Sequence, residues 1–270
     1  MGREDNQPDW DKIAEKFDIW LPQIAPVGIA LLEKLAARPG DNILDMGSGT
    51  GEPALTLARS MGGEVQITGI DAAEGMVRVA QKKVESENLP GIRFQTMPAE
   101  KMSFADSTFD CALCRFGVML FEDPLQGLKE MHRVIRPQGR FALAVWSTPE
   151  TMPTLHWSYQ VFKDRVDEDY YPPLGKVTSL GTPGTMEELL EDAGFSDYRV
   201  EAKTFHYNFN SFDAYWDAVE ASEILQMQYD QLPEDQRHQI RDEVARFARD
   251  FVQDGQLVIP HDYLLVYGNK

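Results

Sequence analysis

The feature that most constrains the fold of this chain is a regular alternation of short apolar stretches and helix-like stretches between residues 42 and 146. Branched apolar runs predict strands, and apolar residues at helical spacing predict helices. The expected strands are Asn42–Met46, Val65–Ile70, Ile92–Thr96, Phe109–Cys114 and Arg140–Trp146. The expected helices are Pro53–Met61, Glu74–Glu87 and Pro124–Ile135. This order predicts a parallel sheet covered by helices on both faces.

The flanking sequence predicts further helices and two more strands. Residues 9–37 predict two helices separated at Pro22, and Arg38-Pro39-Gly40 ends the second. Prolines and aromatic residues over 148–184 predict a loop-rich cap. Beyond the cap we expect helices over Thr185–Ala193, Ser211–Gln228 and Pro233–Asp254, and strands over Ser196–His206 and Leu257–Tyr267.

A glycine-rich segment follows the first expected strand. It reads Asp45-x-Gly47-x-Gly49-x-Gly51, and glycines here allow a sharp turn and close approach of a ligand to main-chain N–H groups. Asp71 ends the second strand, where an acid can accept two hydrogen bonds from a ribose diol. Ligands of open parallel sheets bind at the carboxyl ends of the strands. The segment therefore predicts a nucleotide-like ligand.

The glycine spacing distinguishes between nucleotide ligands. A dinucleotide site requires G-x-G-x-x-G, with the third glycine at the start of the helix. Here the position after Gly51 is Glu52, whose carboxylate would repel a pyrophosphate. The spacing favours a ligand that has no phosphate.

Four segments carry a family resemblance: ILDMGSGTGEPAL, TGIDAAEGMV, FADSTFDCALCRFGVMLFEDP and LKEMHRVIRPQGRFALAVW. In this order and spacing they resemble the class I S-adenosylmethionine-dependent methyltransferases, in the group that includes the ubiquinone and menaquinone biosynthesis enzymes. The resemblance implies a Rossmann-like α/β fold and S-adenosyl-L-methionine as cofactor. It implies cofactor contacts from Asp45, Gly47, Ser48, Gly49, Asp71, Ala72, Met76, Ala99, Glu100 and Arg115.

One residue departs from the family pattern. The family usually has an acid before the alanine of the third-strand motif, whereas this sequence has Pro98 in MPAE. Recognition of the adenine amino group then falls to the main chain at Ala99, to Glu100 or to water.

The resemblance implies methyl transfer by in-line displacement to O, N or C of a small-molecule metabolite. Two alternatives stay open. A related fold can bind the cofactor and run a cyclisation or decarboxylation, or the chain can be a catalytically silent partner subunit. Intact Gly47, Gly49 and Asp71 argue against the silent subunit.

The acceptor side of the site is less well defined. His156, in the cap beside Trp157, is the first candidate for a general base and His206 is the second, each against a structural role; His261 is a third possibility. Arg115 can orient an acceptor's carboxylate or phenolate, contact the cofactor's carboxylate, or pair with an acid of the fold. The expected lid and substrate residues are Phe17, Trp20, Tyr170 and Tyr171.

The composition of the chain limits the classes of partner that we expect it to bind. The net charge of −18 and the absence of the N/D-P-P-Y/F signature disfavour a nucleic-acid substrate. Cys111 and Cys114 lie in an expected buried strand, and no clustered ligand motif indicates a metal. The sequence contains no apolar run of about 20 residues and no secretory signal, so we expect a cytoplasmic protein that acts away from membranes on a small molecule.

These observations predict one α/β domain with a seven-stranded, mostly parallel sheet, helices on both faces and a helical, aromatic cap. Its length of 270 residues with 43% hydrophobic residues supports one large core. We expect an N-terminal helical lid (1–37), a cofactor-binding core (38–147), a cap and substrate region that includes the sixth strand (148–255) and the last strand (256–270).

Overall fold

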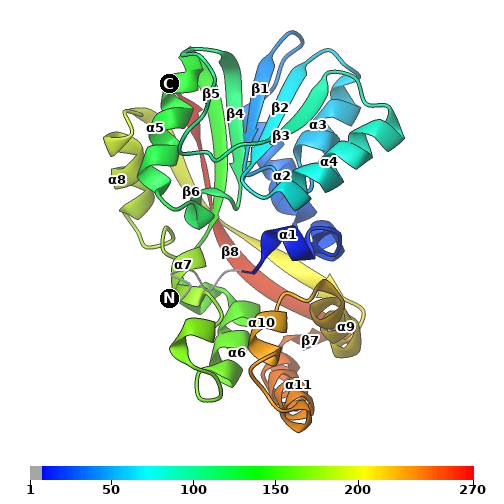
Figure 1. The fold of residues 1–270 in the computed structure, drawn as a ribbon. Coiled ribbons are helices and arrows are strands. Elements are labelled where there is room, and N and C mark those ends of the chain that lie inside the picture. The colour runs from blue at the N-terminus through cyan, green and yellow to red at the C-terminus, as the bar shows by residue number, and fades with distance from the viewer. Residues whose placement is uncertain (1–7) are drawn as a thin grey trace.

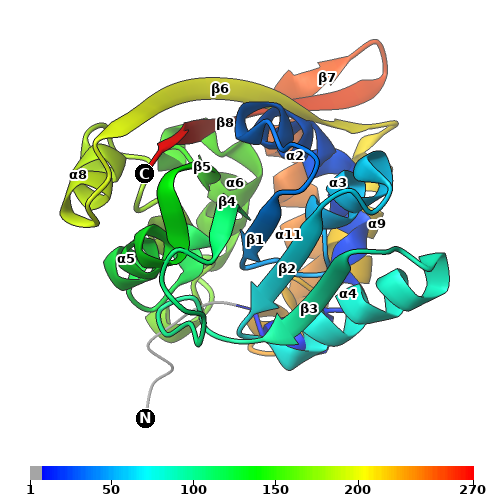
Figure 2. The same cartoon turned by 90° about the horizontal axis from the view of Figure 1, so that it is seen from above.

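A computed structural model describes residues 8–270, and its centre is one eight-stranded sheet (Figures 1 and 2). The strand order is β3-β2-β1-β4-β5-β8-β6, and the two-residue β7 pairs with β8. The strands are β1 Asn42–Met46, β2 Gln66–Asp71, β3 Ile92–Thr96, β4 Phe109–Arg115, β5 Ile135–Trp146, β6 Asp197–Phe209, β7 Val252–Gln253 and β8 Gln256–Asn269.

Strands β1 to β5 are parallel, and β8 is antiparallel to both of its neighbours, β5 and β6. All seven strands expected from the sequence are present. The eighth, β7, was not expected, since a helix was predicted to continue through Asp254. The Rossmann-like α/β class is confirmed, and the parallel strands bring their carboxyl ends to one edge of the sheet.

Helices cover both faces of the sheet. The α-helices are α1 Trp10–Ile13, α2 Leu21–Leu35, α3 Ala54–Met61, α4 Glu74–Glu87, α5 Pro124–Val134, α6 Pro153–Phe162, α7 Leu174–Val177, α8 Thr185–Asp192, α9 Phe212–Ser222, α10 Gln226–Tyr229 and α11 Glu234–Ala248. One apolar cluster packs α2, α3 and α4 against one face of the sheet, and a second cluster packs α5 and α8 against the opposite face.

Five helices, α6, α7, α9, α10 and α11, lie together beyond the carboxyl ends of the parallel strands (Figure 1). We call them the cap. Strands β6 and β8 run from the sheet to the cap, and α1 lies between the two parts. The first apolar cluster continues into the cap through buried residues such as Trp157, Phe162 and Tyr215. The carboxyl edge of the sheet therefore faces a structured cover.

The cap differs from the sequence prediction in two places. Residues 148–184 contain helices α6 and α7 rather than mostly loops, because Pro153 occupies the first turn of α6, where its missing N–H costs nothing. The single helix expected over Ser211–Gln228 is divided into α9 and α10, since Glu223 has left-handed φ (55°) and ends α9.

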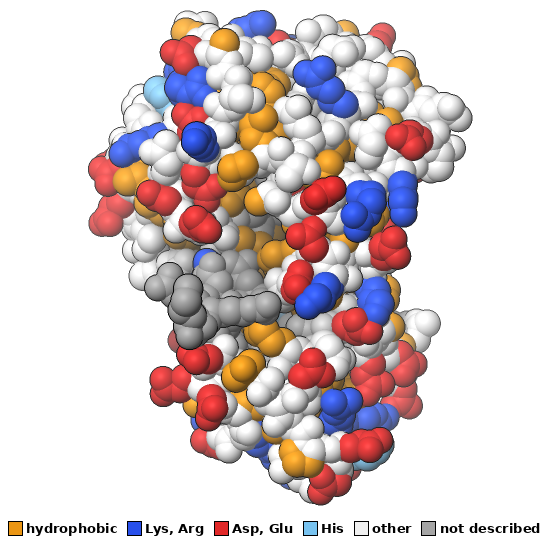
Figure 3. Space-filling model, in the orientation of Figure 1, with side chains coloured by type: hydrophobic (Ala, Val, Ile, Leu, Met, Phe, Trp, Pro, Cys, Tyr) orange, Lys and Arg blue, Asp and Glu red, His pale blue; other side chains and the backbone are white. Residues whose placement is uncertain are grey.

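The surface agrees with the strongly acidic composition. Acidic side chains are spread over the whole face drawn in Figure 3, and hydrophobic side chains gather toward its middle. Among the helices of residues 8–270, none has both the length and the apolar character needed to cross a bilayer.

Candidate cofactor and acceptor site

The glycine turn, residues 47–51, connects β1 to α3. Gly47 and Gly49 have φ of +63° and +53°, a region that glycine adopts without steric cost. A Cβ at Gly47 would lie 3.3 Å from the Cα of Gly117, just beyond β4. Ser48 N–H donates to the carbonyl of Ile70 (2.9 Å), which fixes the turn to the end of β2. The turn therefore lies at the carboxyl edge between β1, β2 and β4.

Asp71, the last residue of β2, binds two main-chain groups. Its carboxylate accepts from Gly49 N–H (2.8 Å) and from Ala73 N–H (2.9 Å). Burial raises the pKa of Asp71, and these two hydrogen bonds oppose that rise. A carboxylate has about four acceptor positions, so two are left for a ligand diol. The role expected for Asp71 is therefore compatible with its role in holding the turn.

Two buried polar atoms at the turn, Asp45 Oδ2 at the end of β1 and Ser48 Oγ, have no hydrogen-bond partner within residues 8–270. Burial raises the pKa of Asp45 well above its ordinary value, and only the neighbouring Arg115 opposes this substantially. Unsatisfied polar atoms in a closed site are costly, and they are expected where a ligand supplies the missing partner.

Arg115, the last residue of β4, lies beside this group. Burial lowers the pKa of its guanidinium, and the nearby acids Asp45 and Glu52 oppose the decrease. No hydrogen bond or ion pair joins it to another described residue. It lines a cleft of about 390 Å³ between α2 and α3, together with Gly28, Glu52 and Pro53. Its five N–H donors are thus free to bind an anion.

The expected adenine contacts lie on the other side of Asp71. The loop after β3 is held there by Met97 N–H, which donates to the Asp71 carbonyl (2.9 Å). Ala99 is buried in this loop, and the Glu100 carboxylate accepts from Glu122 N–H (2.8 Å). Ala72 is exposed directly after β2.

The N-terminal segment 9–20, which contains α1 and the 3₁₀ helix η1 (Phe17–Trp20), packs across this region; we call it the lid. Two of its carboxylates bind the core. Asp11 accepts from Gly75 N–H (2.5 Å) at the start of α4. Asp18 accepts from Thr50 Oγ (2.6 Å) in the glycine turn.

The lid also makes apolar and ionic contacts. Lys83 of α4 pairs with Asp18 (2.6 Å) and donates to the Thr50 carbonyl (2.9 Å). Met76 is buried against Ile13 and Ala14 of the lid. The lid carboxylates Asp11 and Asp18 were not predicted, because no local pattern signals contacts between segments so far apart in sequence.

The two expected aromatic lid residues have different environments. Phe17 is half-buried and meets Trp10 edge to face (5.9 Å between ring centroids). Trp20 is buried and packs against Tyr207 of β6 (5.9 Å) and Tyr215 of α9 (6.5 Å). Trp20 therefore connects the lid to the cap.

The candidate bases are not gathered around the turn. His206 is exposed on the outer face of β6, between the buried rings of Phe205 and Tyr207. His156 is half-buried on α6, and its Nε2 lies 3.3 Å from Gln160 Nε2. Within residues 8–270, no hydrogen bond joins either histidine to the glycine turn.

His261 is fully buried in β8. Its Nδ1 donates to the Ile259 carbonyl (3.2 Å), so Nε2 accepts from Thr154 Oγ (2.8 Å). Burial lowers the pKa of His261 to about 4. Both ring nitrogens are already bonded, which is typical of a structural histidine.

The two cap tyrosines follow α6. Tyr170 ends the 3₁₀ helix η4 (Glu168–Tyr170), and Tyr171 meets Tyr159 of α6 edge to face (5.7 Å). Both side chains are half-buried. Tyr171 thus contacts a ring of the cap, and the substrate role expected for both tyrosines stays a prediction.

Sequence reasoning did not single out Phe116 and Trp146, which directly follow β4 and end β5. Their rings are stacked, with centroids 3.6 Å apart and planes 15° apart. The CRFG motif contained a usable signal, since a bulky residue before a glycine at the end of a strand lies where parallel sheets bind ligands.

Glu52 and the two cysteines, which the sequence singled out, have structural roles. The Glu52 carboxylate accepts from Thr56 N–H (3.1 Å) and pairs with Arg59 (2.7 Å), so it already occupies the start of α3. Cys111 and Cys114 belong to apolar clusters on opposite faces of the sheet, and both are free thiols. Residues 8–270 contain no group of three or more His, Cys, Asp or Glu side chains that could hold a metal ion.

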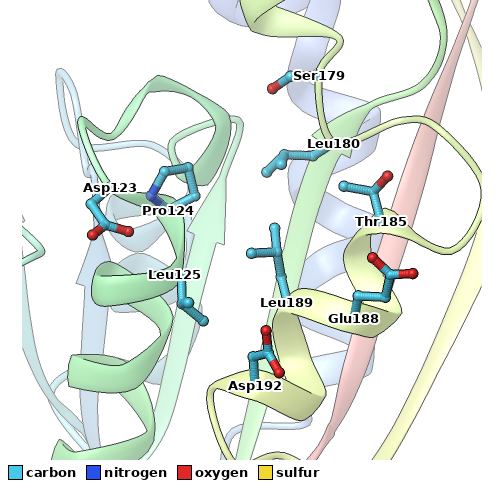
Figure 4. Close-up of a pocket in the computed structure, with 9 residues that line it drawn as sticks. All are labelled: Asp123, Pro124, Leu125, Ser179, Leu180, Thr185, Glu188, Leu189 and Asp192. Carbon is cyan, nitrogen blue, oxygen red and sulfur yellow. The ribbon is translucent and has the colours of Figure 1, made fainter.

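A second hollow of about 420 Å³ lies between α5 and α8 (Figure 4). Leu125, Leu180 and Leu189 line its centre, and Asp123 and Asp192 lie on its rim. None of its lining residues was expected in the site.

The sequence pattern of the ubiE/COQ5 methyltransferase family matches residues 29–208. The chain is 37% identical over 150 residues to the ubiquinone/menaquinone biosynthesis C-methyltransferase UbiE of Geotalea daltonii, a match that covers 53% of this chain and 63% of that protein. It thus spans less than two thirds of this relative's length. It is 33% identical over 188 residues to the protein of the same name from Citrifermentans bemidjiense, covering 67% of this chain and 76% of the relative.

Among solved structures, the chain is similar to a SAM dependent methyltransferase from Aquifex aeolicus. The sequence identity is 27% and the TM-score is 0.53. The match covers 71% of this chain and 91% of the other.

Proposed function

The chain belongs to the ubiE/COQ5 methyltransferase family, and from this membership we propose that it transfers a methyl group from S-adenosylmethionine to a ring carbon of a quinol-type small molecule. The membership confirms the resemblance inferred from the four sequence motifs, and it supports the methyltransferase class and the cofactor. The carbon and the quinol ring are proposed from the names of the relatives.

The main support is the set of partnerless polar groups around the glycine turn. The methionine end of the cofactor carries an ammonium and a carboxylate. Asp45 offers a buried carboxylate oxygen for the ammonium, and Arg115 offers an unpaired guanidinium for the carboxylate. Asp71 offers its two remaining acceptor positions to the ribose diol. The residues present therefore fit the group in charge and in hydrogen-bonding capacity.

When bound, the cofactor supplies a methyl group already activated on a sulfonium. The protein then has to position the acceptor, exclude water and accept one proton, because a ring carbon that gains a methyl group loses its hydrogen as a proton. The lid and the aromatic residues of the cap supply the cover. We keep His156 as the candidate base, because it is half-buried in the cap whereas His206 is exposed.

Calorimetry tests the cofactor assignment. Asp45→Asn and Arg115→Gln should each weaken S-adenosylhomocysteine binding about 10- to 100-fold, as expected for lost charged hydrogen bonds. Affinity for 5′-methylthioadenosine, which lacks the amino-acid end, should stay unchanged in both variants. Equal losses for the two ligands would show general damage to the site, and no binding of either ligand to the wild type would refute the cofactor site.

Product analysis tests the reaction. Reduced demethylmenaquinone and S-adenosylmethionine, incubated with the protein without oxygen, should yield S-adenosylhomocysteine and a ring-methylated quinol. A variant His156→Ala with more than one tenth of the wild-type turnover would remove His156 as the base.

A further inference from the structure

The backbone conformation of Phe116 is unfavourable for a residue with a bulky side chain. Its φ is +59°, in the left-handed region, which is strained for a bulky residue. Among residues 8–270, six other non-glycine residues have positive φ, and all lie at helix ends, in turns or at a strand irregularity: Ala36, Asn88, Ser107, Gln138, Glu223 and Asp254. Phe116 instead follows a central strand at its carboxyl end. Strain of this kind persists where the surroundings impose it, and it is concentrated at functional sites.

This conformation accompanies a flat stack of aromatic rings. Phe116 lies on Trp146 with centroids 3.6 Å apart, and Trp146 lies nearly parallel to Phe205, with centroids 5.8 Å and planes 21° apart. The three rings come from the ends of β4 and β5 and from β6. Phe205 is buried, whereas Phe116 and Trp146 keep part of their surface exposed. The stack therefore has a buried end and a partly open end.

The partly open end of the aromatic stack lies beside the glycine turn. Phe116 is flanked in sequence by Arg115, the unpaired cation, and by Gly117, whose Cα would be 3.3 Å from a Cβ at Gly47. A ring resting on Phe116 would thus lie close to the turn and to a guanidinium that can bind an oxygen anion of the ring.

We propose that Phe116, supported from behind by Trp146, is the surface on which the acceptor ring stacks, and that it selects planar aromatic acceptors. This inference rests on the proposed function, because it requires methyl transfer at this edge of the sheet. Aromatic stacking adds about two- to tenfold to affinity beyond the area buried. Loss of the whole ring should therefore weaken acceptor binding about tenfold or more.

Two probes of similar size distinguish planarity from bulk. 1-Naphthol is flat and resists oxidation better than a quinol, and decahydro-1-naphthol carries an alcohol hydroxyl at the same position of a puckered skeleton. In calorimetry, the wild-type protein with S-adenosylhomocysteine bound should bind 1-naphthol about tenfold more tightly than decahydro-1-naphthol. Phe116→Gly should lose this preference, and Phe116→Tyr should restore it.

The glycine variant separates function from stability. Glycine relieves the left-handed strain, so Phe116→Gly should keep its melting temperature within a few degrees while its affinity for 1-naphthol falls. Should it fail to fold, Phe116→Leu provides the same comparison without planarity. Phe104→Leu is the matched control, because Phe104 packs on Phe109 at the opposite end of β4 (5.0 Å), and it should bind 1-naphthol like the wild type.

The proposal would be overturned if the wild type bound the two probes with equal affinity. It would also be overturned if Phe116→Gly bound 1-naphthol as tightly as the wild type does. Failure of the proposed function would be visible separately, as a wild type that does not bind S-adenosylhomocysteine. Unchanged affinity of Phe116→Gly for S-adenosylhomocysteine would support a defect confined to the acceptor.

Discussion

Replacement of Gly75 by alanine should open the lid without damage to the core. Gly75 lies in the first turn of α4, and a Cβ there would be 2.7 Å from the Asp11 carbonyl oxygen and 2.9 Å from the Asp11 Cα. Both are backbone atoms of the lid, so no side-chain rotation can relieve the overlap. The lid has to move away, and the hydrogen bond from Gly75 N–H to the Asp11 carboxylate is then lost.

The expected magnitude follows from two opposing effects. Loss of this partly exposed, charge-assisted hydrogen bond costs the closed state about 1–2 kcal/mol. Alanine stabilises a helix by up to about 1 kcal/mol relative to glycine, but this gain applies to the open and closed states alike. The open population of the lid should therefore rise about 5- to 30-fold, while the free energy of unfolding falls by between about zero and about 2 kcal/mol, which lowers the melting temperature by at most about 8 °C.

Limited trypsin digestion measures the opening, because Lys12 and Lys16 both lie in the lid. Cleavage there follows the open population when closing is fast relative to proteolysis. The control is Gly175→Ala in α7, where no atom beyond the adjacent residues and the helix's own backbone lies within 4 Å of the added Cβ. Cleavage of Gly75→Ala at the wild-type rate would refute the steric argument, and a larger fall of the melting temperature would show that the core, rather than the lid, had yielded.

Asp71→Asn should weaken S-adenosylhomocysteine binding about tenfold in calorimetry, because an amide offers fewer acceptor positions to a diol; unchanged affinity would contradict this. Burial lowers the pKa of His261 to about 4, so the unfolded chain binds a proton that the folded chain does not. Stability should fall by up to about 3 kcal/mol from pH 6.5 toward 4, and His261→Gln should remove this part in urea unfolding. Cys111 and Cys114 should react with thiol reagents only after unfolding, since burial raises the pKa of both.

Much of the fold could be predicted because the central strands of its sheet are buried on both faces. Asn42–Met46 is a short apolar run, and Ile92–Thr96 alternates apolar with polar residues. Both are bounded by turn residues, and the structure has them with the predicted bounds. The prediction was wrong where one residue type is common in two kinds of structure, as proline is in loops and in the first turn of helices. Prolines over 148–184 indicated loops, but Pro153 begins a helix. The short β7 had no apolar pattern and exists only through its pairing with β8.

The candidate site was predictable where one segment carries it. The glycine turn and Asp71 follow from strand ends and residue spacing. The contacts of Asp11 with Gly75 and of Asp18 with Thr50 join distant segments, so single-sequence patterns do not reveal them. The stacking of Phe116 on Trp146 joins the ends of two different strands, so a local pattern does not reveal it either.

The position of β8 has a consequence for how the protein is made. Strand β8 fills the space between β5 and β6, yet it follows both in sequence. On the ribosome, β5 therefore has an unpaired edge, and β6 has no partner in the sheet, until residues 256–269 have emerged. Such edges can pair with strands of neighbouring chains. The growing chain thus passes through a period of aggregation risk that ends only when β8 joins both strands.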